Sequence, residues 1–320
     1  MKPLPVIDPT DADASERIDA ACRDVGFFAV PLAPAQRTLR DRLIATAAEF
    51  FALPEDEKAK VSMAVGGPAW RGWFPLEGEL TSGVPDRKEG YYFGAELPPD
   101  PRPMHGANIW PARPTELRPL VTEWMATMET LGQQVLALMA VGLGREPDHF
   151  ATGLTARPTP LFRIFRYPPH PAGDARTWGV GEHTDYGLLT LLATDGTPGL
   201  EVNSHGEWIP APADADLVIC NLGDMLDRLT GGRYRSTPHR VRNHAGHDRY
   251  SLPFFLDPGW DAAVEPMTFD DDWQQPADAQ ERWDRANLGD ISGTYGAWLG
   301  AKVAKVFPTL HEELKFLVKD

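Results

Sequence analysis

Residues 181–192 read GEHTDYGLLTLL and combine two potential metal ligands with a strand-like apolar run. His183 and Asp185 lie two positions apart, just before the apolar run of residues 188–192. In extended backbone, residues two apart point to the same side, so both side chains can reach one ion. A chain with nine histidines can contain such a pair by chance. A metal site therefore needs a third ligand, open coordination positions and a pocket.

The composition is that of an ordinary globular protein. The chain has 320 residues, 42% hydrophobic and 24% charged, which is enough to bury a large core. A formal net charge of −15 argues against a nucleic-acid or anionic-membrane surface. The first residues contain no apolar signal region, and no apolar run approaches the length of a membrane span. We expect a cytoplasmic protein that acts on a small molecule and, because no coiled-coil pattern is present, a monomer.

The two cysteines, Cys22 and Cys220, are too few and too far apart for a disulfide framework. Both lie in apolar surroundings. We expect two buried, reduced thiols.

The hydrophobic pattern divides the chain into helical ends and a β-rich middle. Apolar residues recur at helical spacing in the first half, and Gly- and Pro-punctuated β-rich segments follow. Strands are predicted at 4–8 and 26–30, helices at 14–25, 34–53, after Pro54 and at 115–141, loops and short strands at 64–113, closely spaced strands at 158–258, and helix again at 280–318. The segment VNSHGEW, 202–208, is typical of a hairpin turn.

This order of elements predicts an α+β fold in which helices pack on a β-sandwich or barrel. No linker-like stretch separates the parts, so we expect one compact unit over 1–320. Its parts would be a helical N-terminal region with short strands at 1–157, the β core at 158–258 and a C-terminal helical region at 259–320.

A third candidate ligand, His239, lies in RYRSTPHRV, 54 residues beyond Asp185. Two histidines and one carboxylate occupy one face of an octahedron in non-haem Fe(II) oxygenases and leave the opposite positions open. The same ligands also suit the zinc of a hydrolase. A structural metal in a non-catalytic jelly roll would need a closed coordination sphere, and no fourth ligand is evident.

A second pair, Arg249 and Ser251 in RYSLPFF, shares one face of a strand that is otherwise apolar. A guanidinium fork and a hydroxyl together can bind a carboxylate. A buried arginine needs an anionic partner. A dicarboxylate co-substrate, chelating the metal at one end and held by this pair at the other, would supply one. A zinc hydrolase gives no reason for the pair.

Taken together, the motifs resemble those of the isopenicillin N synthase-like family of Fe(II)/2-oxoglutarate-dependent oxygenases. The resemblance covers nearly the whole length. The motifs that carry it are LPVID, GFFAV, FFALPEDEKAKV, RGWFPLEGE, DRKEGYYFG, RYPP, EHTDYGLLTLL, NLGDMLDRLTGGRYRSTPHRV and RYSLPFF.

The resemblance implies a distorted double-stranded β-helix, or jelly roll, flanked by N- and C-terminal helices. It implies that His183, Asp185 and His239 bind Fe(II). It further implies that Arg249 and Ser251, helped by Tyr167, bind the far carboxylate of 2-oxoglutarate, with O2 as the oxidant.

The activity implied is oxidation of an unactivated C–H bond of a small molecule, most simply hydroxylation, with desaturation or cyclisation as variants, in a secondary biosynthetic pathway. Within the family, an Fe(II) oxidase that does not use 2-oxoglutarate is the alternative, and there the Arg-Ser pair would hold the substrate. Outside it, the alternative is a metal-binding jelly roll without activity. The presence of Asp185 argues against halogenation.

Two further expectations concern the pocket. Family members line it with residues of the aromatic loops, which here contain Arg71, Trp73, Tyr91, Tyr92 and Phe93. The C-terminal segment PTLHEELKFLVKD, 308–320, would either cover the pocket as a lid or pack on the barrel as a surface helix.

Overall fold

The computed structural model describes residues 3–81, 83–98, 100, 102–170, 178–274 and 293–306, with side chains of the last helix described as far as residue 302. The helices of this part of the chain are α1 (Ala14–Asp24), α2 (Pro34–Phe51), α3 (Glu55–Ala59), α4 (Met63–Gly66), the 3-10 turn η1 (Gly67–Ala69), α5 (Leu117–Gly142), α6 (His149–Thr152), α7 (Asp224–Leu229) and α8 (Tyr295–Val306). The strands are β1 (Phe27–Pro31), β2 (Gly72–Phe74), β3 (Glu89–Gly94), β4 (Thr159–Tyr167), β5 (Val180–His183), β6 (Leu189–Thr194), β7 (Leu200–Ser204), β8 (Glu207–Pro210), β9 (Leu217–Leu222), β10 (His239–Val241) and β11 (Arg249–Asp257).

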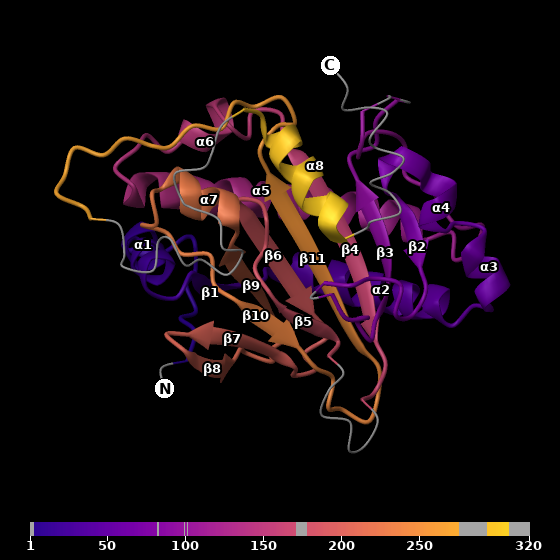
Figure 1. Cartoon of the computed structure of the whole chain (residues 1–320). Helices are drawn as coiled ribbons and strands as arrows, with labels where there is room; N and C mark the ends of the chain where they lie inside the picture. Colours follow the sequence, from indigo (N-terminus) through magenta and orange to yellow (C-terminus); the bar gives the residue numbers. More distant parts are fainter. Residues whose placement is uncertain are drawn as a thin grey trace.

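The strands form two antiparallel sheets. The major sheet has seven strands in the order β1-β9-β6-β11-β4-β3-β2, and the minor sheet has four in the order β5-β10-β7-β8 (Figure 1). Several neighbouring strands come from distant parts of the sequence: β11, for example, lies between β4 and β6. This arrangement confirms the expected α+β jelly roll with flanking helices.

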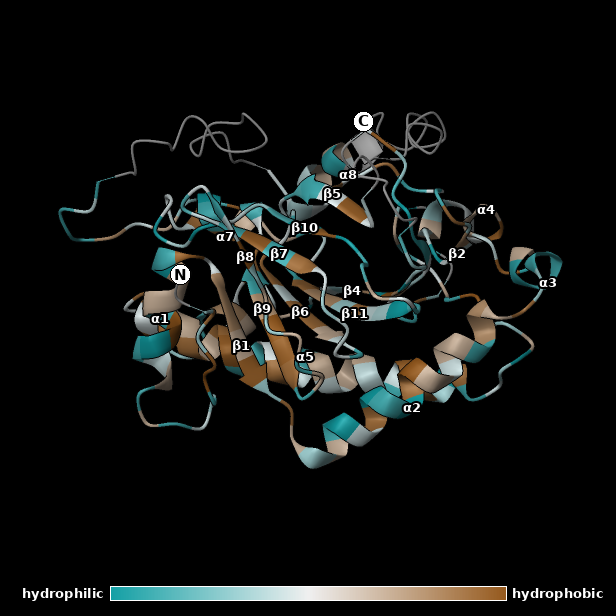
Figure 2. Cartoon of the chain, turned by 90° about the horizontal axis from the view of Figure 1, so that it is seen from below, coloured by the Kyte–Doolittle hydropathy of each residue, from teal (hydrophilic) through white to brown (hydrophobic). Residues whose placement is uncertain are grey.

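Helices cover the face of the major sheet that is turned away from the minor sheet. The long helix α5 contacts β4, β6 and β11, and α1 and α2 pack against it (Figure 2). Its apolar stripe is buried as the helical spacing predicts, with Trp124, Met128 and Val135 inaccessible to solvent. The helix ends where Gly144 adopts the left-handed conformation that glycine favours. The large core cluster extends from Ile7 to Leu299, so both ends of the described chain contribute to it.

Local predictions agree with the structure in most places. The helices predicted at 14–25, 34–53 and 115–141 are α1, α2 and α5. The predicted turn in 202–208 is the β7–β8 hairpin, where His205 and Gly206 both have positive φ, as a two-residue turn of type I′ requires.

Two predicted elements differ from the described structure or extend beyond it. Residues 4–8 do not form the predicted strand, because Pro5 has no N–H to donate to a ladder. Only Val6 makes an isolated bridge, to Ala29. A helix was predicted at 280–318, and the described residues of this range include α8. Residues 308–320 lie outside the described part of the chain.

Cys22 and Cys220 are free and buried, as expected, and burial raises the pKa of both thiols. Within the residues described, none of the helices combines the length and apolar character needed to cross a bilayer.

Candidate active site

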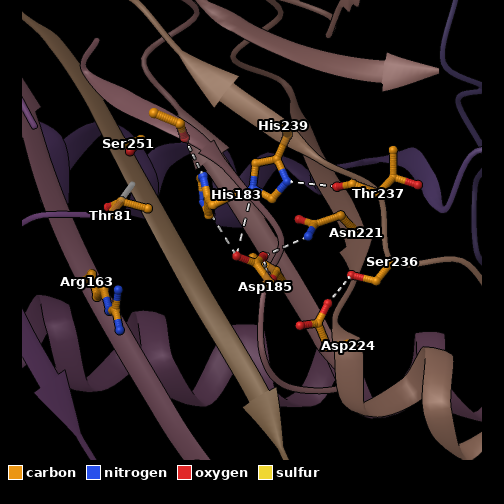
Figure 3. Close-up of polar contacts among 12 residues, drawn as sticks. Thr81, Arg163, His183, Asp185, Asn221, Asp224, Ser236, Thr237, His239 and Ser251 are labelled. Carbon is orange, nitrogen blue, oxygen red and sulfur yellow. Dashed lines mark hydrogen bonds and ion pairs between the residues drawn. The ribbon is translucent and has the colours of Figure 1, made fainter. Parts of the chain in front are cut away.

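The pairing of two short strands brings the candidate ligands together. β5 and β10 are antiparallel neighbours in the minor sheet, and His239 lies directly opposite His183. Asp185 follows two residues after His183, so its carboxylate reaches the same point. The Nε2 atoms of His183 and His239 lie 3.9 and 3.8 Å from Asp185 Oδ1 (Figure 3). Ligand atoms of these three residues all lie within 4.8 Å of one another, close enough to hold one ion.

Hydrogen bonds from the protein orient both imidazole rings. The Nδ1 atoms of His183 and His239 lie 2.8 and 3.1 Å from the carbonyl oxygens of Gly181 and Thr237. A carbonyl oxygen can only accept, so each Nδ1 carries the proton and each Nε2 presents its lone pair.

The carboxylate of Asp185 is oriented in the same way. Its Oδ2 accepts hydrogen bonds from Thr190 Oγ1 at 2.5 Å and Asn221 Nδ2 at 2.7 Å. Its Oδ1 remains directed at the two Nε2 atoms. Each of the three residues therefore has one atom held by the protein and one left for a metal.

The ionisation states also suit a metal. Burial, reinforced by the neighbouring His239, lowers the pKa of His183, so the ring is neutral. Burial opposes ionisation of Asp185, but His239, His183 and the two hydrogen bonds outweigh it and lower the pKa of the carboxyl. A neutral imidazole and an ionised carboxylate are the forms that bind metal ions.

A cavity lies beside the three candidate metal ligands, and alternate residues of the neighbouring strands β4 and β11 line it. Side chains alternate between the faces of a strand, so every second residue of β4 and of β11 points into it. The contributing residues are Leu161, Arg163, Phe165 and Tyr167 of β4, and Arg249, Ser251, Pro253, Phe255 and Asp257 of β11.

The Arg-Ser pair lies in this cavity beside Tyr167. Arg249 is opposite Tyr167 in the strand register, and Ser251 Oγ donates to Tyr167 Oη at 3.4 Å. Arg249 is 1% exposed, and its Nε donates to Thr197 O at 3.1 Å. Its Nη1 has no hydrogen-bond partner among the described residues. A buried guanidinium with an unused donor fits a carboxylate ligand.

Helix α8 closes one side of the cavity. Leu299 lines it, Trp298 Nε1 donates to Tyr186 O at 3.2 Å, and Lys302 Nζ donates to Asp224 Oδ2 at 3.2 Å. In Figure 1 this helix lies across the major sheet near β11 and β4. The segment 308–320, considered as a lid, lies outside the described residues.

The five predicted pocket residues are buried, but none of them lines this cavity. Trp73 donates to Glu89, and Tyr91 donates to Ile109 O. Arg71 donates to the carbonyl oxygens of Ala69 and Met104, and Phe93 stacks on Tyr91. Burial of these aromatic rings stabilises the packing of β2 and β3 against the helices.

Tyr92 is connected to the cavity indirectly. Its hydroxyl donates to Glu79 at 2.6 Å, and Glu79 lines the cavity. Sequence reasoning did not identify Glu79, Lys88, Arg163 or Asn221. Asn221 had a detectable signal, since a polar amide in the apolar strand LVICNL needs a partner.

Comparison with known proteins identifies the family. The model of the non-haem dioxygenase N-terminal region, described for morphine synthesis, matches residues 2–113, and the 2OG-Fe(II) oxygenase superfamily model matches residues 158–258. A Dictyostelium discoideum protein named "Probable iron/ascorbate oxidoreductase" is 39% identical, covering 92% of this chain and 89% of that protein. The 2-oxoglutarate-dependent dioxygenase caaD of Aspergillus niger is 36% identical, covering 79% and 83%.

Among solved structures, the chain is similar to a full-length Neurospora crassa protein in complex with alpha-KG. The TM-score is 0.79 at 25% identity, covering 94% of this chain and 96% of that one. The geometry described above and these relationships lead to one assignment. The chain belongs to the 2OG-Fe(II) oxygenase superfamily and is an oxygenase that uses Fe(II), 2-oxoglutarate and O2.

Proposed function

We propose that the enzyme hydroxylates an unactivated C–H bond of a small molecule. In this proposal His183, Asp185 and His239 hold the iron. Arg249, Ser251 and Tyr167 hold the far carboxylate of 2-oxoglutarate. The observation that carries the assignment is the buried, unpaired Nη1 of Arg249 in the same cavity as the triad, with no partner among the described residues.

Fe(II) bound at such a site supplies the activation of O2 that C–H oxidation requires. The chain itself fixes geometry. The triad would supply three ligands, and a set of two histidines and one carboxylate leaves further coordination positions for the co-substrate and O2. Alternate apolar residues of the cavity wall, among them Leu161, Phe165 and Leu192, exclude water from the reacting centre. The protein's contribution is to hold the co-substrate at one end and aim one C–H bond of the substrate.

The names of relatives support a small-molecule substrate. One relative is the clavatol oxidase claD of Penicillium crustosum, 35% identical over 80% of this chain. A second structure of the Neurospora crassa protein contains alpha-KG and thymine, with a TM-score of 0.78 at 25% identity. We propose a substrate of similar size, used in a biosynthetic pathway.

The test is a turnover screen. The iron-loaded enzyme is given 2-oxoglutarate, O2 and a library of small molecules, and succinate and product are measured together. We expect one succinate per product, and a product that has gained one oxygen atom. A product that has lost two hydrogen atoms would instead show desaturation or ring closure.

Asp185→Ala serves as the control that removes a proposed iron ligand. Product formed without succinate would overturn the proposal. It would assign Arg249 and Ser251 to the substrate of an oxidase.

A further inference from the structure

We infer that Arg163 is the substrate-recognition residue of this cavity and that the substrate is an apolar molecule carrying a carboxylate. The inference rests on the proposed function, because it concerns the substrate of the same site. Its basis is a second guanidinium in the cavity that the iron and co-substrate assignments leave unused.

Arg163 lies on the same face of β4 as Tyr167, four residues earlier, and both line the cavity. At about 3.3 Å per residue, the two Cα atoms are roughly 13 Å apart along the strand. The proposed carboxylate clamp is at the Tyr167 end, where Arg249 is its register partner. Arg163 is therefore at the opposite end of the wall. A co-substrate whose far carboxylate is held at Tyr167 leaves Arg163 to a second ligand.

Two aromatic rings hold the guanidinium in place. Its central carbon lies 4.2 Å from the ring centre of Tyr92, the cross-strand partner of Arg163, and 4.9 Å from that of Phe255. The side chain is 24% exposed. A guanidinium packed against ring faces keeps its N–H groups in its own plane, so they stay available at the edges.

The nearest carboxylate does not use those N–H groups. Arg163 Nη1 lies 3.8 Å from Glu79 Oε1, which is beyond hydrogen-bond distance. Glu79 already accepts from Tyr92 Oη at 2.6 Å and lies 2.8 Å from Lys88 Nζ. Across the described parts of the chain, no group accepts a hydrogen bond from the Arg163 guanidinium. In Figure 3 it lies across Asp185 from Asn221, and no dashed line reaches it.

A guanidinium has five N–H donors in a planar fork that matches the two oxygens of a carboxylate. The walls nearest to Arg163 along β4 and β11 are apolar, with Leu161, Phe165 and Pro253 lining the cavity. A ligand that accepts hydrogen bonds from the guanidinium and packs against these apolar side chains has a carboxylate attached to an apolar body. The competing role for Arg163 is only to balance the charge of Glu79, and a lysine would fulfil that role equally well.

The experiment uses the full-length protein with Fe(II) and 2-oxoglutarate, without O2. Matched pairs of aromatic and aliphatic monocarboxylates and their primary amides are titrated, and binding is followed through the visible charge-transfer band of the iron–2-oxoglutarate chelate and by thermal shift. We expect the acids to bind about 10- to 100-fold more tightly than their amides. In Arg163→Lys this preference should weaken by about tenfold, because an ammonium keeps the charge but lacks the planar fork, while the band and the affinity for 2-oxoglutarate remain.

Arg166→Lys is the matched control. Arg166 lies on the same strand but pairs with Asp248 and Glu89 instead of lining the cavity. The acid preference should survive in this variant.

Acids that bind no better than their amides, including the case in which neither binds, would overturn the inference. Full acid preference in Arg163→Lys would also overturn it, because the planar guanidinium fork would then not be what recognises the carboxylate. A missing band in the iron-loaded wild-type protein would instead indicate failure of the proposed function.

Discussion

Each of the two sheets contributes one end of the site. The two ends differ in how many of the polar groups of their side chains form hydrogen bonds within the protein. The minor sheet supplies His183 and His239, and protein hydrogen bonds orient both rings. The major sheet supplies Arg249 and Arg163, whose guanidinium groups retain donors that no described residue uses. The metal end is therefore preorganised before the ion arrives, whereas the ligand end is completed only by bound anions.

The largest effect is expected at the metal end. Asp185→Ala removes the carboxylate on which both imidazoles converge, and we expect product formation to fall by at least about 100-fold, with loss of iron. Iron content by metal analysis and succinate release measure the two effects. Retention of stoichiometric iron and of activity would show that the metal lies elsewhere.

At the ligand end, Arg249→Met removes the buried donor without touching the triad. We expect the KM for 2-oxoglutarate to rise by about 10- to 100-fold because charge-assisted hydrogen bonds are lost. Iron affinity should not change. An equal loss of iron affinity would mean that the two ends of the site do not act separately, and the comparison between the sheets would fail.

A smaller effect is expected for residues that do not bind the metal themselves but form hydrogen bonds with a metal ligand. Thr190→Val removes one of the two hydrogen bonds that orient Asp185, and iron affinity should weaken by about tenfold, at the low end of such outer-shell effects. Thr194→Val, on the same strand, is the control, because its hydroxyl accepts from Gly196 N and does not contact the triad. Iron titration of both variants checks the difference. Equal behaviour of the two would remove the assigned role of Thr190.

The prediction with the smallest effect on catalysis concerns Asp257, which lines the cavity and accepts from Tyr295 Oη at 2.6 Å and Leu188 N at 3.1 Å. Burial raises the pKa of this carboxyl to about 6. A raised pKa means that the folded state binds the proton more tightly, so this stabilisation is present below about pH 4 and is lost as the pH rises through about 6.

The free energy of unfolding should therefore decrease by at most about 3 kcal/mol as the pH rises over this range. The Asp257→Asn variant, which has no carboxyl at this position, should lack this decrease. Urea unfolding of both proteins at several pH values measures it. Parallel pH profiles would show that Asp257 titrates normally.

The sequence predicts those parts of the site that depend on residues close together in the chain, and not those that depend on how distant segments pair. His183 and Asp185 share a face because they are two apart on extended backbone, and the same reasoning identifies Arg249 and Ser251. The register that sets His239 opposite His183 depends on how two strands far apart in the sequence pair, which local pattern cannot specify.

The cavity wall was harder to predict than the metal ligands. Arg71, Trp73 and Phe93 come from a segment rich in aromatic residues that was expected to form pocket loops. Trp73 and Phe93 instead lie on β2 and β3, and all three are buried in the protein away from the cavity. Arg163 was not predicted as a site residue. RIFRY contains two arginines, Arg163 and Arg166, which are three residues apart and therefore point to opposite faces of the strand. Tyr167 shares a face with Arg163 and not with Arg166, and the pairing of β4 with β3 and β11 places that face along the cavity.

The most direct test of the account is an anaerobic titration of the Fe(II) protein with 2-oxoglutarate, followed through the visible charge-transfer band of the chelate. Wild type, Asp185→Ala and Arg249→Met are compared. The account predicts a saturable band in wild type, no band in Asp185→Ala, and in Arg249→Met the same band at about 10- to 100-fold higher 2-oxoglutarate. Bound iron without a band in wild type, or an unchanged midpoint in Arg249→Met, would contradict it.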